Sequence, residues 1–266
     1  MKSEQGVTVG SIGQLARLWA SEKRSEGKSD GKPDTKLETK LETKLDCIYW
    51  PEIASTNDQA KSMSISAPEL LLVTDHQTHG RGRFERVWES PPAGTALLSS
   101  WIFLLKHPPV PQITPKIGLA MWRAAKSVFP QGEWSLKAPN DLYLSNKKVA
   151  GVLVETITQG LQTKVIVGIG VNVMALPETT ESATDFQSSL QLTREQMWPA
   201  MSDFLSYLLL GLRRTMQTAN EALATHEQIA LREALNSRSG LTEKLQRVGA
   251  DGSLIFSEKT ISWQDL

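Results

Sequence analysis

Residues 134–173 read WSLKAPNDLYLSNKKVAGVLVETITQGLQTKVIVGIGVNV, and four predicted strands follow one another along this stretch. Apolar and β-branched runs bounded by turn residues indicate strands at 134–137, 142–144, 149–156 and 163–173. The pair Asn146-Lys147 marks a hairpin turn between two of them. Because no helical pattern separates these strands, they predict a largely antiparallel or mixed sheet and not a strict βαβ repeat.

Further strands and helices are predicted on both sides of this stretch. The strands lie at 45–50, 70–76 and 94–105. The helices lie at 11–24, 57–66, 114–129 and 193–223, the last with one or two breaks. A few short strands are expected in residues 245–263, around the turn Ala250-Asp-Gly-Ser. This mixed order of helices and strands predicts an α+β fold.

Composition narrows the classes of protein to consider. The chain has 266 residues and a formal net charge of +0 at pH 7, which gives no reason to expect nucleic acid or a membrane as the main partner. The single cysteine, Cys47, excludes an internal disulfide and fits a reducing compartment, and it is interpreted as a small core residue. With no signal peptide and no run of membrane-spanning length, the expected location is the cytoplasm.

Residues 77–88 combine glycines with arginines in one predicted loop. Gly80 and Gly82 free the backbone to wrap closely around a ligand, and three guanidinium groups suit phosphate or carboxylate. The loop therefore predicts an anionic ligand, first of all one that carries phosphate. The alternative is a solvated surface loop, and Trp88 at its end is more often a core residue than a ligand platform.

Four other clusters are ambiguous when taken singly. Ser55-Thr56-Asn57 fits a helix N-cap, and Asp141 fits a turn. Gly151 inside a strand indicates either close approach by a ligand or a bulge. Gly168-Ile-Gly170 resembles half of a dinucleotide fingerprint, but Val173 stands at the third glycine position, and no Walker loop is present. The four histidines show no metal-ligand spacing.

In this order and spacing the clusters resemble the motifs of biotin protein ligases, which activate biotin with ATP and attach it to a carrier protein. The resemblance covers roughly residues 45–215. The matching pieces are Ser55-Thr56-Asn57, Gln77 with Gly80-Arg-Gly-Arg83 and Arg86-Val-Trp88, Lys137-x-Pro-Asn-Asp-Leu142, Lys147-Lys-Val-Ala-Gly-Val-Leu-Val-Glu155, and Gly168-Ile-Gly-Val-Asn172.

The resemblance implies a fold and a division of the chain. The fold is the biotin ligase catalytic fold, similar to class II aminoacyl-tRNA synthetases, with a mixed or antiparallel sheet and helices packed on one side. Residues 1–44 would be an N-terminal extension with a low-complexity linker, 45–225 the catalytic domain, and 226–266 a short, reduced C-terminal β segment. Residues 1–44 are too short for the DNA-binding domain of repressor-type members, so a catalytic-only enzyme without DNA binding is expected.

The resemblance also implies roles for individual residues. The catalytic groups would be Lys148, Arg83 and Lys137. Biotin would contact Ser55, Thr56, Asn57, Gln77, Arg81, Gly82, Arg83, Lys148 and Gly151. The nucleotide would contact Arg81, Arg83, Arg86, Trp88, Asn140, Asp141 and Asn172, with Asp141 also a candidate ligand of Mg²⁺. Ala138, where the family usually has Trp, and Glu85, where glycine is common, depart from the family pattern.

The implied substrates are biotin and ATP with Mg²⁺, and the implied partner is the biotin carboxyl carrier domain of a carboxylase. A sheet edge could pair with that carrier or with a second copy of the chain, and both would be β-augmentation. Two alternatives remain. A lipoate or octanoate ligase would share the fold and the lysine chemistry, whereas a biotin-binding sensor would have lost catalysis. A DNA-binding regulator is disfavoured by the neutral charge.

Overall fold

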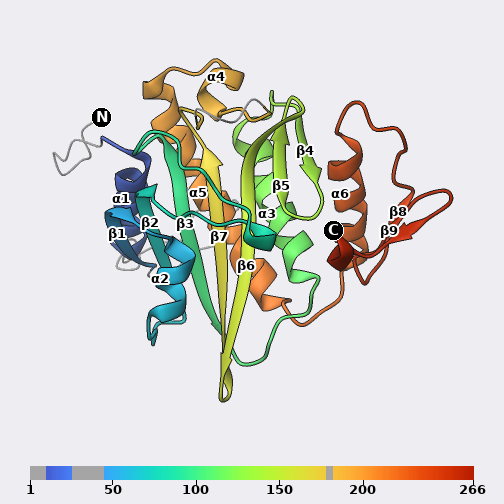
Figure 1. The fold of residues 1–266 in the computed structure, drawn as a ribbon, viewed down its shortest axis with the longest axis horizontal. Coiled ribbons are helices and arrows are strands. Elements are labelled where there is room, and N and C mark those ends of the chain that lie inside the picture. The colour runs from blue at the N-terminus through green and yellow to red at the C-terminus, as the bar shows by residue number, and fades with distance from the viewer. Residues whose placement is uncertain (1–9, 26–44, 178–181) are drawn as a thin grey trace, which may run out of the picture.

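The computed structural model describes residues 10–25, 45–177 and 182–266. A seven-stranded sheet with strand order β1-β2-β3-β7-β6-β5-β4 forms its centre (Figure 1). Only β1 and β2 pair in parallel, and every other pair in this sheet is antiparallel. The strands are β1 Asp46–Ile53, β2 Glu69–Gln77, β3 Ala96–Leu105, β4 Trp134–Lys137, β5 Asp141–Leu144, β6 Lys147–Gln159 and β7 Gln162–Asn172. The predicted α+β class with a mixed sheet is confirmed.

Three helices cover one face of this sheet, as the resemblance implied. They are α1 Ile12–Ser25, α3 Ile113–Val128 and α5 Arg194–Gln217. Alternation along β2 sends Leu71 and Val73 into the core beneath these helices. Leu70 and Leu72 point to the opposite face, where they pack with Ala60 of the short helix α2 Thr56–Ser62. The face that carries α2 is otherwise left open by the helices (Figure 1).

The N-terminal helix belongs physically to the sheet. The predicted helix at 11–24 is confirmed as α1, and its apolar side buries Ile12, Ala16 and Trp19 against the core. The ring centroids of Trp19 and Trp101 lie 6.0 Å apart in an edge-on arrangement, and Trp19 Nε1 donates to Ser206 Oγ at 2.9 Å. We therefore propose that the sheet domain includes α1. Residues 26–44, where the low-complexity linker is expected, lie outside the described residues.

The turn between β5 and β6 lies one residue earlier than predicted. Its central residues are Ser145 and Asn146, with φ of 47° and 63°, and Leu144 pairs with Lys147 across it. Two consecutive residues with positive φ form the turn whose twist suits a two-residue hairpin. The prediction of Asn146-Lys147 was wrong by one position, because the sequence pair does not reveal which residue takes the strained conformation.

The C-terminal region holds elements that the sequence did not predict. Helix α6 Thr225–Asn236 packs beside β4, and the short helix α4 Phe186–Leu190 follows Asp185, which caps it. The predicted short strands are present as a three-stranded antiparallel sheet of β8 Arg247–Val248, β9 Leu254–Ile255 and β10 Thr260–Ile261. Within the described ranges, none of the helices has the length and apolar character needed to cross a membrane.

Candidate functional site

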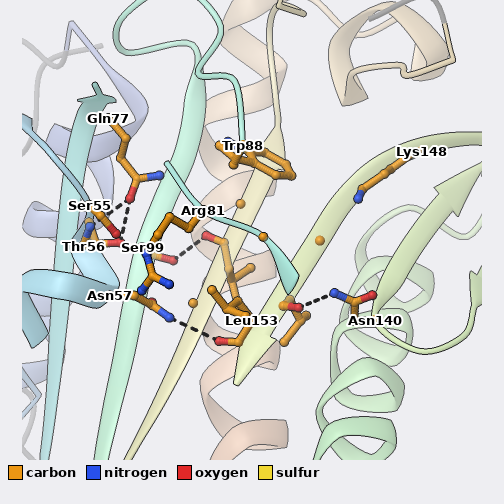
Figure 2. Close-up of a pocket in the computed structure, with 16 residues that line it drawn as sticks. Ser55, Thr56, Asn57, Gln77, Arg81, Trp88, Ser99, Asn140, Lys148 and Leu153 are labelled. Atoms are coloured by element: carbon orange, nitrogen blue, oxygen red, sulfur yellow. Dashed lines mark hydrogen bonds between the residues drawn. The ribbon is translucent and has the colours of Figure 1, made fainter. Parts of the chain in front are cut away.

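Two adjoining cavities lie on the sheet face that carries α2, and Figure 2 shows the residues that line the inner one. The inner cavity, about 60 Å³, lies between the start of α2, strands β6 and β7, and the loop 77–88. The outer cavity, about 340 Å³, lies beyond Trp88 and reaches Asn172 and Pro177. Trp88 and Lys148 line both cavities. The predicted residues that line the inner cavity are Ser55, Thr56, Asn57, Gln77, Arg81, Gly82, Trp88, Asn140, Lys148 and Gly151.

A hydrogen-bonded network fixes the polar end of the inner cavity. Ser55 is the N-cap of α2 and accepts from the backbone N–H of Asp58, so the capping interpretation is correct for this residue. Gln77 Oε1 accepts from the backbone N–H and the hydroxyl of Thr56, at 2.9 and 3.1 Å. Ser100 Oγ, on β3, donates to Asn57 Oδ1 at 2.5 Å. These hydrogen bonds fix the orientation of the Thr56, Asn57 and Gln77 side chains at the cavity.

The glycines of β7 make room for two of these side chains. A Cβ on Gly168 would lie 2.4 Å from Asn57 Oδ1, and a Cβ on Gly170 would lie 2.6 Å from the Trp88 ring. Both distances are too short for any other residue type without movement of the neighbour. The Gly-x-Gly pair therefore serves side-chain packing in the middle of a strand. This supports rejecting the dinucleotide fingerprint, which requires a turn leading into a helix.

The arginine loop folds back on itself and crosses the cavity. The backbone N–H of Trp88 donates to Gly80 O at 2.9 Å, and that of Gly82 donates to Arg86 O at 2.6 Å. Phe84, at the tip, has a φ of 53° and is 71% exposed. Trp88 is half-buried, and its Nε1 has no hydrogen-bond partner among the described residues. Trp88 thus lines both cavities and is not part of the main core cluster.

Lys148 is the cation at the junction of the two cavities. Its Nζ lies 2.7 Å from Asp141 Oδ1 and 5.8 Å from the centre of the Trp88 ring. Burial lowers the pKa of Arg83, and the neighbouring Arg86 lowers it further, whereas Asp141 raises it. Asp141 therefore lies near both cations. It is the first residue of β5, paired with Gly151, so the turn-former interpretation is wrong.

The remaining predicted residues are divided: Lys137 and Arg86 line neither cavity, whereas Asn140 lines the inner one. Lys137 is exposed, and its Nζ lies 5.9 Å from the centre of the Tyr143 ring. Arg86 is exposed, and Asn140 donates through Nδ2 to Val152 O at 2.6 Å. Asn172 lines the outer cavity, where its Oδ1 is buried without a partner in the described part of the chain. Ala138 faces α6 and the C-terminal sheet through a separate groove.

Two carboxylates that the sequence analysis did not select hold Arg81. Asp58 accepts from Arg81 Nε at 3.0 Å and from Nη2 at 2.5 Å. Glu155, on β6, lies 3.2 Å from the same Nη2 and 2.7 Å from Lys61 Nζ. The one available signal was the position of Asp58 at the third residue of a capped helix, which favours an acidic side chain. Glu155 had been noted only as the last residue of a motif.

The carboxyl groups of Asp58 and Glu155 should make the stability of the fold depend on pH. Burial alone would raise the pKa of each carboxyl, but hydrogen bonds from Arg81 to Asp58 and from Lys61 and Asn57 to Glu155 hold both pKa values below the ordinary 3.8 and 4.5. A carboxyl whose pKa is lower in the folded than in the unfolded state stabilises the fold at a pH above its unfolded-state pKa. This stabilisation is lost as the pH falls through the folded-state pKa. Wild type should therefore melt higher than Asp58→Asn at about pH 6 and lose that advantage towards about pH 3. A constant difference across this range would refute the assignment.

Cys47 has no nucleophilic role at this site. It lies on β1, and burial raises the pKa of its thiol to about 12, although Arg17 lowers it slightly. A thiol with such a pKa stays protonated near neutral pH, and the protonated form is a poor nucleophile. The interpretation of Cys47 as a packing residue is consistent with its contact with the core cluster.

The open face of the mixed sheet carries a polar pocket, which the arginine loop crosses and Lys148 flanks. An α+β domain with such a pocket suits a small anionic ligand. Residues 49–172 match the model of the Biotin/lipoate A/B protein ligase family, in agreement with the resemblance that the sequence motifs predicted.

Curated relatives and a solved structure agree with this assignment. Over 132 residues the chain is 35% identical to biotin–protein ligase 1, chloroplastic, of Arabidopsis thaliana, covering 47% of this chain and 36% of the relative. Over 151 residues it is 33% identical to the bifunctional ligase/repressor BirA of Bacillus subtilis, covering 54% and 45%. The chain thus spans half or less of these relatives. The biotin protein ligase from Aquifex aeolicus in complex with biotin and ATP superimposes with a TM-score of 0.62 at 26% identity, covering 81% of this chain and 94% of that one.

Proposed function

We propose that the chain is an ATP-dependent biotin–protein ligase. The observation that carries the proposal is the place of Lys148, whose side chain lines both the inner and the outer cavity. Biotin would occupy the inner cavity and the nucleotide the outer one, so that the lysine lies where carboxylate and phosphate meet. Support comes from the family match over residues 49–172 and from a structural neighbour described as a complex with biotin and ATP.

The proposed reaction has two steps. A biotin carboxylate oxygen attacks the α-phosphorus of ATP, pyrophosphate leaves, and biotinyl-5′-AMP forms. A lysine amine of the carrier protein then attacks the acyl carbonyl, AMP leaves, and an amide bond forms. The first step brings two anions together, so cations must offset their repulsion and stabilise the charge on the phosphoryl oxygens. Lys148 would supply this charge. Arg83, which has Asp141 as a neighbouring charge, and Lys137 line neither cavity and would act from farther away.

The remaining residues would bind and orient the two substrates. Thr56, Asn57 and Gln77 offer donors and acceptors of the kind that a ureido ring needs. The inner cavity of about 60 Å³ is smaller than a typical ligand pocket of about 300 Å³ or more, so the entry of biotin would require the pocket to widen. Asn172 offers its unpartnered Oδ1 to the nucleotide.

Magnesium enters the proposal as the ion that accompanies ATP. Asp141 was the candidate ligand, but its carboxylate already contacts Lys148. No group of three or more His, Cys, Asp or Glu gathers as a metal site in the described residues. These residues do not form a protein-built magnesium site, and no step is assigned to the ion.

The proposal extends to the setting of the enzyme. The partner is a biotin carboxyl carrier domain, which an exposed sheet edge would meet by strand addition, and a homodimer through such an edge is the competing use. The chain would act in the cytoplasm, without DNA. Residues 45–225, together with α1, would be the catalytic domain, and 226–266 an accessory segment.

Exchange of labelled pyrophosphate into ATP tests this function. The exchange should depend on added biotin and should not appear with lipoate or octanoate. Exchange with lipoate or octanoate alone would favour the related acyl ligases. Biotin binding without any exchange would favour the sensor.

A further inference from the structure

Lys164, on β7, binds the C-terminal end of α2. Its Nζ donates to the backbone carbonyl oxygens of Ala60, Lys61 and Met63, at 2.8, 3.1 and 2.7 Å. The N–H of Met63 closes the last helical hydrogen bond onto Gln59 O, so the four carbonyls that follow have no partner within the helix. An ammonium has three donors, and they match three of these carbonyls. Its positive charge also suits the negative end of the helix dipole.

Polar contacts hold α2 on the sheet more than apolar packing does. The helix has seven residues, and a helix of this length is not stable alone. Among its buried residues only Ala60 is apolar. The hydrogen-bonded network at the inner cavity fixes its N-terminal end, and Lys61 pairs with Glu155 at 2.7 Å. Lys164 supplies the contact at the C-terminal end.

One face of β7 follows α2 along the length of the helix. Because side chains alternate along a strand, Lys164, Ile166 and Gly168 lie on the same face. Lys164 binds the last turn, Ile166 belongs to the apolar cluster of Ala60, and Asn57 fills the space beside Gly168. The helix is about 10 Å long, and the strand from 164 to 168 spans about 13 Å. Both ends of α2 are thus fixed against the same strand.

Lys164 itself lies outside the pocket. It lines neither cavity, and its ammonium is engaged by the three carbonyls of α2. At the opposite end of the helix, Thr56 and Asn57 reach the inner cavity (Figure 2). An effect of Lys164 on a ligand in this cavity must therefore pass through the position of α2.

We propose that Lys164 is a positioning residue for the biotin pocket. By binding the C-terminal carbonyls it fixes where α2 lies along β7, and with the helix it fixes the place of Thr56 and Asn57 in the inner cavity. The consequence for biotin rests on the proposed function, whereas the anchoring of the helix does not. Biotin binding should thus depend on a lysine that the ligand does not touch.

Amide hydrogen exchange in Lys164→Met measures the anchoring without any ligand. Methionine keeps a long apolar side chain but has no donor for the three carbonyls. The amides of α2 should exchange at least about tenfold faster than in wild type, because hydrogen bonds from a charged group to the helix end are lost.

The matched control is Lys116→Met. Lys116 Nζ likewise binds backbone carbonyls after a helix, those of Thr218 and Glu221 beyond the end of α5, at 2.8 and 3.0 Å. It lines neither cavity. This variant loses the same kind of contact elsewhere in the fold, so it should leave the exchange of the α2 amides within about twofold of wild type.

A kinetic measurement tests the consequence for biotin. In biotin-dependent pyrophosphate exchange, Lys164→Met should raise KM for biotin about tenfold and change kcat less than about threefold. The displaced Thr56 and Asn57 would weaken binding of the ureido ring, which is remote from the reacting carboxylate. In an Asn57→Ala background the same substitution should raise KM less than about threefold, since both changes act through the same contact.

The outcomes separate the anchoring, the positioning role and the proposed function. Exchange of the α2 amides within twofold of wild type in Lys164→Met would overturn the anchoring. Faster amide exchange with an unchanged KM for biotin, or an equal rise of KM in Lys116→Met, would overturn the positioning role. No pyrophosphate exchange in wild type, together with faster amide exchange in Lys164→Met, would overturn the proposed function and support the anchoring.

Discussion

Replacing Lys148 with alanine should lower biotin-dependent pyrophosphate exchange about a hundredfold or more. The lysine Nζ is the cation that faces both cavities, and the adenylation step concentrates negative charge where they meet. Losing one positioned charge in a partly closed site raises the barrier by about 3 kcal/mol. The measurement is the rate of labelled pyrophosphate incorporation into ATP at saturating biotin. Substrate binding should weaken less than turnover, because the charge matters most in the transition state.

Lys147→Ala is the matched control for this experiment. Lys147 is the adjacent residue on β6, and it is exposed on the side away from the cavities, which it does not line. Its loss should change exchange by less than about twofold. Undiminished exchange in Lys148→Ala, or equal loss in both variants, would remove the catalytic role proposed for Lys148. A melting curve of each variant shows whether Asp141, left without its lysine, destabilises the fold.

Replacing Trp19 with alanine should lower the free energy of unfolding by about 3–5 kcal/mol. The indole is 3% exposed, packs edge-on against Trp101, and donates to Ser206 of α5. Its removal leaves a cavity between α1 and the sheet, and Ser206 Oγ loses the Trp19 donor but keeps its hydrogen bond to Ser202 O. Urea denaturation followed by Trp fluorescence or circular dichroism gives the value. The expected loss is a large fraction of the stability of an ordinary domain.

The control for this variant is Leu161→Ala, at the tip of the β6–β7 hairpin. Leu161 is 90% exposed, so its truncation should change stability by less than about 0.5 kcal/mol. A loss below about 1 kcal/mol in Trp19→Ala would mean that α1 is a dispensable extension. The larger loss would place residues 12–25 in the same cooperative unit as the sheet.

Local patterns explain how far the fold could be predicted. The strands of the central sheet were found because apolar runs and turn residues are properties of neighbouring positions, and β4 matches its predicted range. Helix α6 was missed because its buried apolar residues are only Leu231, Ala234 and Leu235, a weak stripe over 12 residues. The turn at Ser145-Asn146 was predicted one position too late, because residue type alone does not determine which residues adopt positive φ.

The site was less predictable, because its contacts are distant in sequence. Along the sequence, Arg81 is 23 residues from Asp58 and 74 residues from Glu155. The residue type of an Asp or Glu does not indicate which distant arginine it will pair with. Gly168 and Gly170 resembled only half of a dinucleotide fingerprint in the sequence, and that pattern gave no sign that they accommodate Asn57 and Trp88. The resemblance to a known family selected the residues around both cavities, but it did not reveal that Arg81 and Asp141 are already engaged in ion pairs.

The central claim is that the covered pocket joins biotin to AMP. The direct measurement is mass spectrometry of the small molecules released from the protein after brief incubation with biotin and ATP and denaturation. The account predicts biotinyl-5′-AMP close to one per protein molecule, with release of an equal amount of pyrophosphate. Recovery of unchanged biotin and unchanged ATP from a protein that had bound both would contradict it.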